Sequence, residues 1–172
     1  MTESFDLETR QQIYHLIEQN PGLNLTHIAK YLSLNIPLVD YHTRQLEDQE
    51  LITIVKEGGF KRYYIKGKIG TYDQKVLNVL RQDIPLRIVL FLLQNPRCQH
   101  KEILSQFDVA ASTLTYHLNK LMKLHILVKE KTGHDHVYSV NNSNQVMHFL
   151  MRYRPSRVLK RFSDTWDDFG IP

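Results

Sequence analysis

The sequence lacks several features that mark particular protein classes. Its 172 residues include one cysteine, Cys98, which excludes an intramolecular disulfide and a thiolate zinc cluster. The longest apolar run, Ile88 to Leu93, is far shorter than the roughly 20 residues that span a bilayer. The N-terminus has no basic region followed by an apolar stretch, so a secretory signal is not expected. We therefore expect a cytoplasmic protein with no membrane partner.

Signatures of catalysis are missing as well. The seven glycines form no phosphate-binding loop, and serine, histidine and aspartate do not occur in a recognisable catalytic order. His134 and His136 flank Asp135, but a hairpin tip gives a metal ion no supporting hydrogen-bond partners. Cys98, expected in a loop between helices, is interpreted as an inert thiol rather than as a redox sensor. We expect no enzyme activity, no metal and no cofactor.

The charge is mild and unevenly placed. The chain has a net charge of +4 and a pI near 9.1, and 42% of its residues are apolar, enough for compact cores. Residues 1–85 carry 10 Lys/Arg and 11 Asp/Glu, whereas residues 86–172 carry 12 and 7. A polyanion would therefore bind mainly to the second half of the chain.

The sequence contains an internal repeat with an offset of 75 residues. Asn20-Pro21 recurs as Asn95-Pro96, and Tyr41-His42 recurs as Tyr116-His117. Without a gap, 11 of the 56 positions from 10 to 65 are identical, and the apolar positions keep the same phase. The chain is therefore interpreted as two copies of one small domain.

Each copy is predicted to contain three helices followed by a β-hairpin. In the first copy, periodicity, caps and turns predict helices over 13–19, 24–32 and 36–49, with strands at 51–55 and 62–65. In the second copy, they predict helices over 88–94, 102–107 and 111–123, with strands at 126–131 and 137–140. Further helices are predicted within residues 67–83, over 145–153 and over 156–169.

This order of elements, with a tight turn between the second and third helices, describes a winged helix-turn-helix. The segments Ile28–Leu32 and Tyr116–Leu121 are similar to that family's signature. Over residues 8–66 and 84–141, the chain resembles winged-helix transcription regulators of the ArsR/MarR kind, and most of all archaeal regulators with two such domains in tandem. The resemblance implies double-stranded DNA as partner, with the third helix in the major groove. Winged helices also serve as protein-docking modules.

The predicted fold class is mainly α with small β-hairpins (α+β). The predicted organisation is a first winged helix-turn-helix domain at 1–67, a connecting helix at 68–83, a second winged helix-turn-helix domain at 84–141 and C-terminal helices at 142–172.

The third helix of the second copy has the side chains that read base edges. With its leucines inward, it turns outward Ser112, Thr113, Thr115, Tyr116, Asn119 and Lys120. Asparagine pairs with adenine, and threonine contacts the thymine methyl. A solvated helix face is the alternative interpretation.

The third helix of the first copy is less suited to contact base edges in DNA. It offers Tyr41, Arg44 and Gln45, but Asp40 would repel phosphate and Leu38 exposes apolar surface. Base contact and protein contact both stay open for this helix.

The first hairpin tip carries Lys61 and Arg62 beside Phe60, which suits a phosphate or minor-groove contact, or else forms an ordinary basic turn.

The C-terminal region is the candidate dimer element, because dimeric helix-turn-helix proteins read paired half-sites. Phe162, Trp166 and Phe169 recur at helical spacing after the basic run Arg152–Arg161, either as a dimer seam or packed on their own chain. The leading hypothesis is a homodimeric regulator that occupies promoter DNA. The rival is a tandem winged-helix scaffold of a larger assembly. The sequence indicates neither a small-molecule effector nor the operator.

Overall fold

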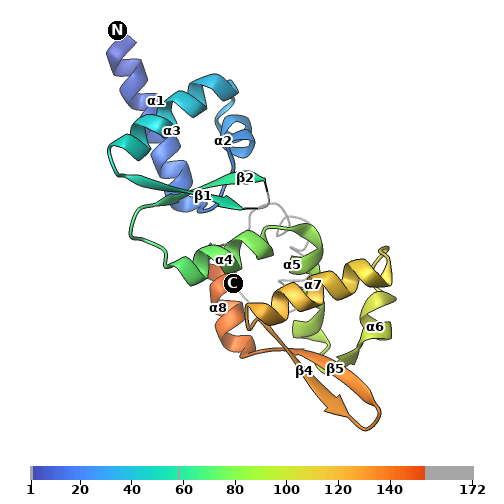
Figure 1. Cartoon of the computed structure of the whole chain (residues 1–172). Helices are drawn as coiled ribbons and strands as arrows, with labels where there is room; N and C mark the ends of the chain where they lie inside the picture. Colours follow the sequence, from blue (N-terminus) through green and yellow to red (C-terminus); the bar gives the residue numbers. More distant parts are fainter. Residues whose placement is uncertain (1, 58, 154–172) are drawn as a thin grey trace. The chain divides into compact units, whose positions relative to one another are not determined.

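The computed structural model describes residues 2–57 and 59–153. It contains two compact units, residues 1–78 (unit 1) and residues 79–172 (unit 2), and confirms the expected fold class of helices with small antiparallel hairpins (Figure 1).

Unit 1 contains three helices and a two-stranded hairpin, followed by a fourth helix in which the boundary between the units falls. The elements are α1 Thr2–Gln19, α2 Leu25–Leu32, α3 Ile36–Asp48, β1 Ile52–Glu57, β2 Phe60–Ile65 and α4 Thr71–Leu80. The strands pair antiparallel, from Ile52 opposite Ile65 to Glu57 opposite Phe60. They reach closer to the turn than the sequence predicts.

Asparagine residues cap the N-termini of α2 and α3. The side-chain oxygen of Asn24 accepts a hydrogen bond from the His27 backbone at 2.9 Å, and that of Asn35 does the same for Leu38 at 2.9 Å. Between them, Ser33 adopts a left-handed conformation with φ of 54°. The two caps and the left-handed residue mark where α2 ends and α3 begins, and so form the turn of the helix-turn-helix.

The core of unit 1 forms where α1, α2 and α3 meet the hairpin (Figure 1). Its members are Ile13, Ile17, Leu23, Ile28, Ala29, Val39, Leu46, Ile52, Tyr63 and Ile65. The inward residues of α3 therefore hold its opposite face toward solvent.

Unit 2 repeats this plan and adds one short strand and one helix. Its elements after α4 are α5 Asp83–Gln94, β3 Cys98–Gln99, α6 His100–Leu104, α7 Ala111–Lys123, β4 Leu127–Thr132, β5 Asp135–Val140 and α8 Ser143–Tyr153. The strand order is β3-β5-β4, antiparallel throughout. Cys98 lies in β3, opposite Tyr138, and not in the loop that the sequence predicted.

The repeat extends to backbone conformation. Tyr63 bridges to Leu23 in unit 1, and 75 residues later Tyr138 pairs with Cys98 in unit 2. Left-handed residues also recur at this offset, as the pairs Gly22 and Arg97, Glu50 and His125, and Gly67 and Asn142. The internal duplication is thus a property of the fold as well as of the sequence.

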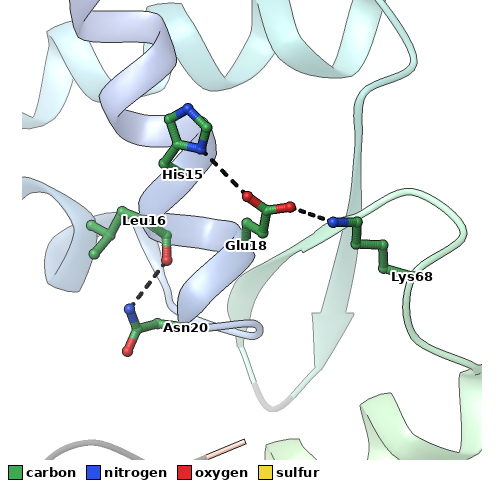
Figure 2. Close-up of polar contacts among 5 residues, drawn as sticks. All are labelled: His15, Leu16, Glu18, Asn20 and Lys68. Atoms are coloured by element: carbon green, nitrogen blue, oxygen red, sulfur yellow. Dashed lines mark hydrogen bonds and ion pairs between the residues drawn. The ribbon is translucent and has the colours of Figure 1, made fainter.

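Two sets of polar contacts lie at the C-terminal end of α1. The first recurs at the end of α5 in unit 2, and the second involves residues of unit 1. The Asn20 side chain donates to the Leu16 carbonyl at 3.3 Å, as Asn95 does to Phe91 at 3.0 Å. Glu18 lies between His15 and Lys68, as Figure 2 shows. The hydrogen bond from Lys68, and then that from His15, lowers the pKa of the Glu18 carboxyl. This pairing ties α1 to the loop after β2.

Candidate nucleic-acid interface

The outward face of α7 consists of the polar residues that the sequence singled out. Leu114, Leu118 and Leu121 are buried against the rest of unit 2. Opposite them lie the exposed Ser112, Thr115, Tyr116 and Asn119 and the half-buried Thr113 and Lys120. The structure thus brings all six predicted residues to the same helix.

Two of these side chains are uncommitted, in the sense that their polar atoms have no partner among the described residues. Within the described part of the chain, neither Ser112 nor Asn119 has a hydrogen-bond or ion-pair partner, and 60% of Tyr116 is exposed. Lys120 reaches Gln82 only at 3.5 Å, between its Nζ and the amide Oε1. An amide without a protein partner is free to bond a base edge.

Thr115 differs from its neighbours because its hydroxyl is engaged. Its Oγ1 donates to the Ala111 carbonyl at 2.8 Å and lies 3.0 Å from Nε2 of His100 on α6. Sequence reasoning did not single out His100, because only the fold brings α6 beside the middle of α7.

The third helices of the two units carry opposite charge. α7 contains Lys120 and Lys123 and no acidic residue, a net of +2. α3 contains Arg44 with Asp40, Glu47 and Asp48, a net of −2. The net charge of α7 thus favours a polyanion such as a nucleic acid, and that of α3 disfavours one.

The candidate residues on α3 are less available than the sequence suggested. Tyr41 is 48% exposed and Gln45 is half-buried, but Arg44 Nη2 pairs with Asp40 Oδ2 at 2.6 Å. The i,i+4 spacing on a helix brings Arg44 and Asp40 together, so the Arg44 guanidinium is engaged in an ion pair at the surface. Beside them, Ile36 is 47% exposed.

On the first hairpin, the structure separates the two predicted cations. Lys61 is exposed, whereas Arg62 is buried, with Nε donating to Asn78 Oδ1 at 3.0 Å and Nη1 donating to the Gly22 carbonyl at 3.1 Å. The structure thus engages Arg62, predicted from the sequence as a DNA contact, in hydrogen bonds within unit 1, and leaves Lys61 as the exposed cation of the pair. Four consecutive residues of β2, from Arg62 to Ile65, are buried, so the alternation of side chains along a strand does not predict which of the two cations is buried.

Both acidic residues of the second hairpin have partners within unit 2. The Arg97 guanidinium pairs with Glu130 at 2.5 Å, and the Gln99 amide donates to Asp135 at 3.2 Å. Both acids of this hairpin are thus engaged, while Lys131 stays exposed. The described residues contain no group of histidine, cysteine and acidic side chains that suits a metal ion.

A family model described as winged helix-turn-helix DNA-binding matches the chain twice, at residues 6–53 and 81–128. The chain belongs to this family. The two matches again lie 75 residues apart; the first includes α2, α3 and most of α1, and the second includes α5, α6 and α7, so the tandem winged helix-turn-helix arrangement is confirmed. The family is a DNA-binding class and not an enzyme class, in agreement with the sequence-based expectation.

Similar proteins include an uncharacterized HTH-type transcriptional regulator of Methanocaldococcus jannaschii, 30% identical over 136 residues. That match covers 79% of this chain and 34% of the relative, so the chain spans about a third of the relative's length.

Solved structures with winged-helix likeness include reduced HlyU from Vibrio cholerae, 20% identical with a TM-score of 0.41, covering 47% of this chain and 86% of HlyU. An ArsR-like transcriptional regulator from Rhodococcus is 18% identical with a TM-score of 0.39, covering 56% of this chain and 84% of its own. Within the described residues, no helix is long and apolar enough to cross a membrane.

In each winged helix-turn-helix unit, a histidine of the third helix faces inward. His42 is fully buried with neither ring nitrogen hydrogen-bonded, and its Nε2 lies 3.6 Å from Asp6 Oδ1. His117 is half-buried, with its Nδ1 buried and lacking a hydrogen-bond partner. Burial lowers the pKa of both imidazoles, which favours their neutral form. These histidines support the helices and do not belong to the outward face.

The thiol is suited to an inert role. Burial raises the pKa of Cys98, and the Glu102 carboxylate raises it further, so the reactive thiolate is disfavoured. The neighbouring Arg97, a cation that could otherwise stabilise a thiolate, is paired with Glu130. The predicted aromatic dimer residues Phe162, Trp166 and Phe169 and the basic run beyond Tyr153 lie outside the described residues.

Proposed function

We propose that this chain is a transcription regulator that reads promoter DNA through α7 of unit 2. The observation that carries this proposal is the contrast between two helices at equivalent positions of the repeat. α7 has a net charge of +2 and an uncommitted asparagine, whereas α3 has a net charge of −2 and an arginine neutralised by Asp40.

In this proposal, base edges and phosphates are contacted by different residues. Asn119, Ser112, Thr113, Thr115 and Tyr116 face the major groove, where each bidentate pair discriminates by about 1–3 kcal/mol. The cations Lys120 and Lys123 of α7, together with Lys61 and Lys131 of the hairpins, contact phosphates. Such contacts position the protein and carry no sequence information.

We also propose that the regulator acts as a homodimer. Two copies of unit 2 would then read half-sites about one helical turn of DNA apart. The proposed seam is the aromatic stripe near the C-terminus.

The test compares two variants at equivalent positions of the repeat, Asn119→Ala on α7 and Arg44→Ala on α3. Fluorescence anisotropy measures binding to a selected duplex and to random duplex DNA. Asn119→Ala should weaken binding to the selected duplex by about 1–3 kcal/mol and leave random DNA nearly unaffected, since only a base contact is lost. Arg44→Ala should change neither. Equal losses on both duplexes for Asn119→Ala would contradict base reading by α7.

One observation favours a second candidate function, a protein-contact role for unit 1. The α2–α3 surface exposes Tyr31, Ile36 and Tyr41, at 45%, 47% and 48%, around the neutralised Asp40–Arg44 pair. Apolar side chains are typical of protein contacts and not of phosphate contacts. A scaffold without DNA recognition would bind all duplexes equally weakly, so the anisotropy comparison separates the two functions.

A further inference from the structure

The Thr115 hydroxyl has no hydrogen left to offer a base. A hydroxyl carries one hydrogen, and Oγ1 of Thr115 donates it to the Ala111 carbonyl at 2.8 Å. The same oxygen lies 3.0 Å from His100 Nε2, which then acts as the donor to it. Both contacts are internal to unit 2, although Thr115 is exposed.

These two contacts fix the orientation of the Thr115 side chain. A threonine is stiff about its first side-chain bond, and bonding to the carbonyl four residues earlier selects among its few rotamers. The hydrogen bond from His100 holds the same oxygen from a second helix. Because both contacts engage the hydroxyl, the methyl is the group of Thr115 left for contact with a ligand, and its orientation is set before any ligand binds.

Unit 1 has no counterpart of this arrangement. At the offset of 75 residues, His100 corresponds to Leu25 and Thr115 to Asp40. Leu25 has no polar side-chain atom, and Asp40 is paired with Arg44. The pair of His100 and Thr115 thus belongs to the unit whose third helix carries the uncommitted polar face.

We propose that Thr115 reads DNA through its methyl group, that the base it selects is thymine, and that His100 is the positioning residue. Thymine is the base that presents a methyl group in the major groove, and an apolar contact there distinguishes it from cytosine. This proposal rests on the proposed function of α7.

The test uses the full chain and measures, at each position of a selected duplex, the preference for thymine over cytosine. Thr115→Val keeps a methyl and removes the hydroxyl. A valine in a helix has one strongly preferred rotamer, whereas a threonine divides between two, so the valine methyl needs no hydrogen bond from His100 and the thymine preference should remain. Thr115→Ser keeps the hydroxyl and removes the methyl, and should reduce the preference at one position about fourfold, the value of burying one methyl-sized group. Loss of the preference in Thr115→Val, with retention in Thr115→Ser, would overturn methyl reading.

Two substitutions test the role of His100. His100→Leu, which places there the residue of the first copy, should lower the thymine preference at the same position. His100→Gln supplies an amide donor and should restore it. His100 is half-buried and makes one hydrogen bond at an exposed site, so both variants should fold and should lower the thermal unfolding midpoint by no more than about 8 °C. An unchanged preference in His100→Leu would overturn the positioning role. If the wild type itself prefers no sequence, the proposed function fails, an outcome distinct from failure at Thr115 alone.

Discussion

Replacing Arg62 with alanine should destabilise unit 1 instead of weakening DNA contact. The guanidinium is buried and donates to Asn78 Oδ1 at 3.0 Å and to the Gly22 carbonyl at 3.1 Å. A hydrogen bond from a charged donor contributes about 1.5–3 kcal/mol, and removal leaves two acceptors without this donor. The expected loss is about 3–5 kcal/mol of unfolding free energy, a large share of the stability of a small domain.

The assay is thermal and urea unfolding of the full chain, with Lys61→Ala as control. At about 4–8 °C per kcal/mol for a domain of this size, the midpoint of Arg62→Ala should fall by at least about 12 °C. The neighbouring Lys61 is exposed, so Lys61→Ala should leave the midpoint within about 2 °C. If Arg62→Ala unfolds like the wild type and only its DNA affinity drops, Arg62 contacts DNA and its buried placement is refuted.

Three further predictions concern phosphate contact, pH and assembly. Lys61→Ala should weaken binding to all duplexes equally. The slope of log K against the logarithm of salt concentration should decrease by roughly one counterion, and an unchanged slope would show that this hairpin does not contact the phosphates. Because burial lowers the pKa of His42 and His117 below the ordinary 6.5, the unfolded chain takes up protons first. The free energy of unfolding should therefore be highest above pH 6.5 and should decrease as the pH falls below that value. Urea unfolding midpoints at pH 7.5 and pH 5.5 measure this decrease, which His42→Phe should make smaller. Deleting residues 156–172 should give a monomer with both units folded and much weaker DNA affinity, and sedimentation of a persistent dimer would place the seam elsewhere.

Much of the fold followed from local pattern. The offset of 75 residues, the asparagine caps at Asn24 and Asn35, and the leucine spacing of α7 predicted the tandem units and the boundaries of their third helices. Such features depend on residues within one or two helical turns of each other. The short strand at Cys98 was missed, because its pairing with Tyr138 forms only across the folded unit.

In the candidate site, too, the features set by local sequence were predictable and those set by tertiary contacts were not. The outward set on α7 was predictable from helical periodicity, and the pairing of Arg44 with Asp40 was readable as an i,i+4 pair. The burial of Arg62 depends on Gly22, 40 residues away, and on Asn78. The contact between His100 and Thr115 depends on the docking of α6 against α7. These placements are properties of tertiary structure, which no single-segment pattern contains.

Selection of bound sequences from random duplex DNA tests the central claim most directly. It is performed with the wild type and with an Asn119→Ala variant, under identical salt. If α7 of unit 2 reads bases, the wild type should enrich a defined sequence, and the variant should lose the preference at the base pair that Asn119 contacts while the flanking preferences persist. Enrichment of the same sequence by both proteins, or of none by the wild type, would contradict the account.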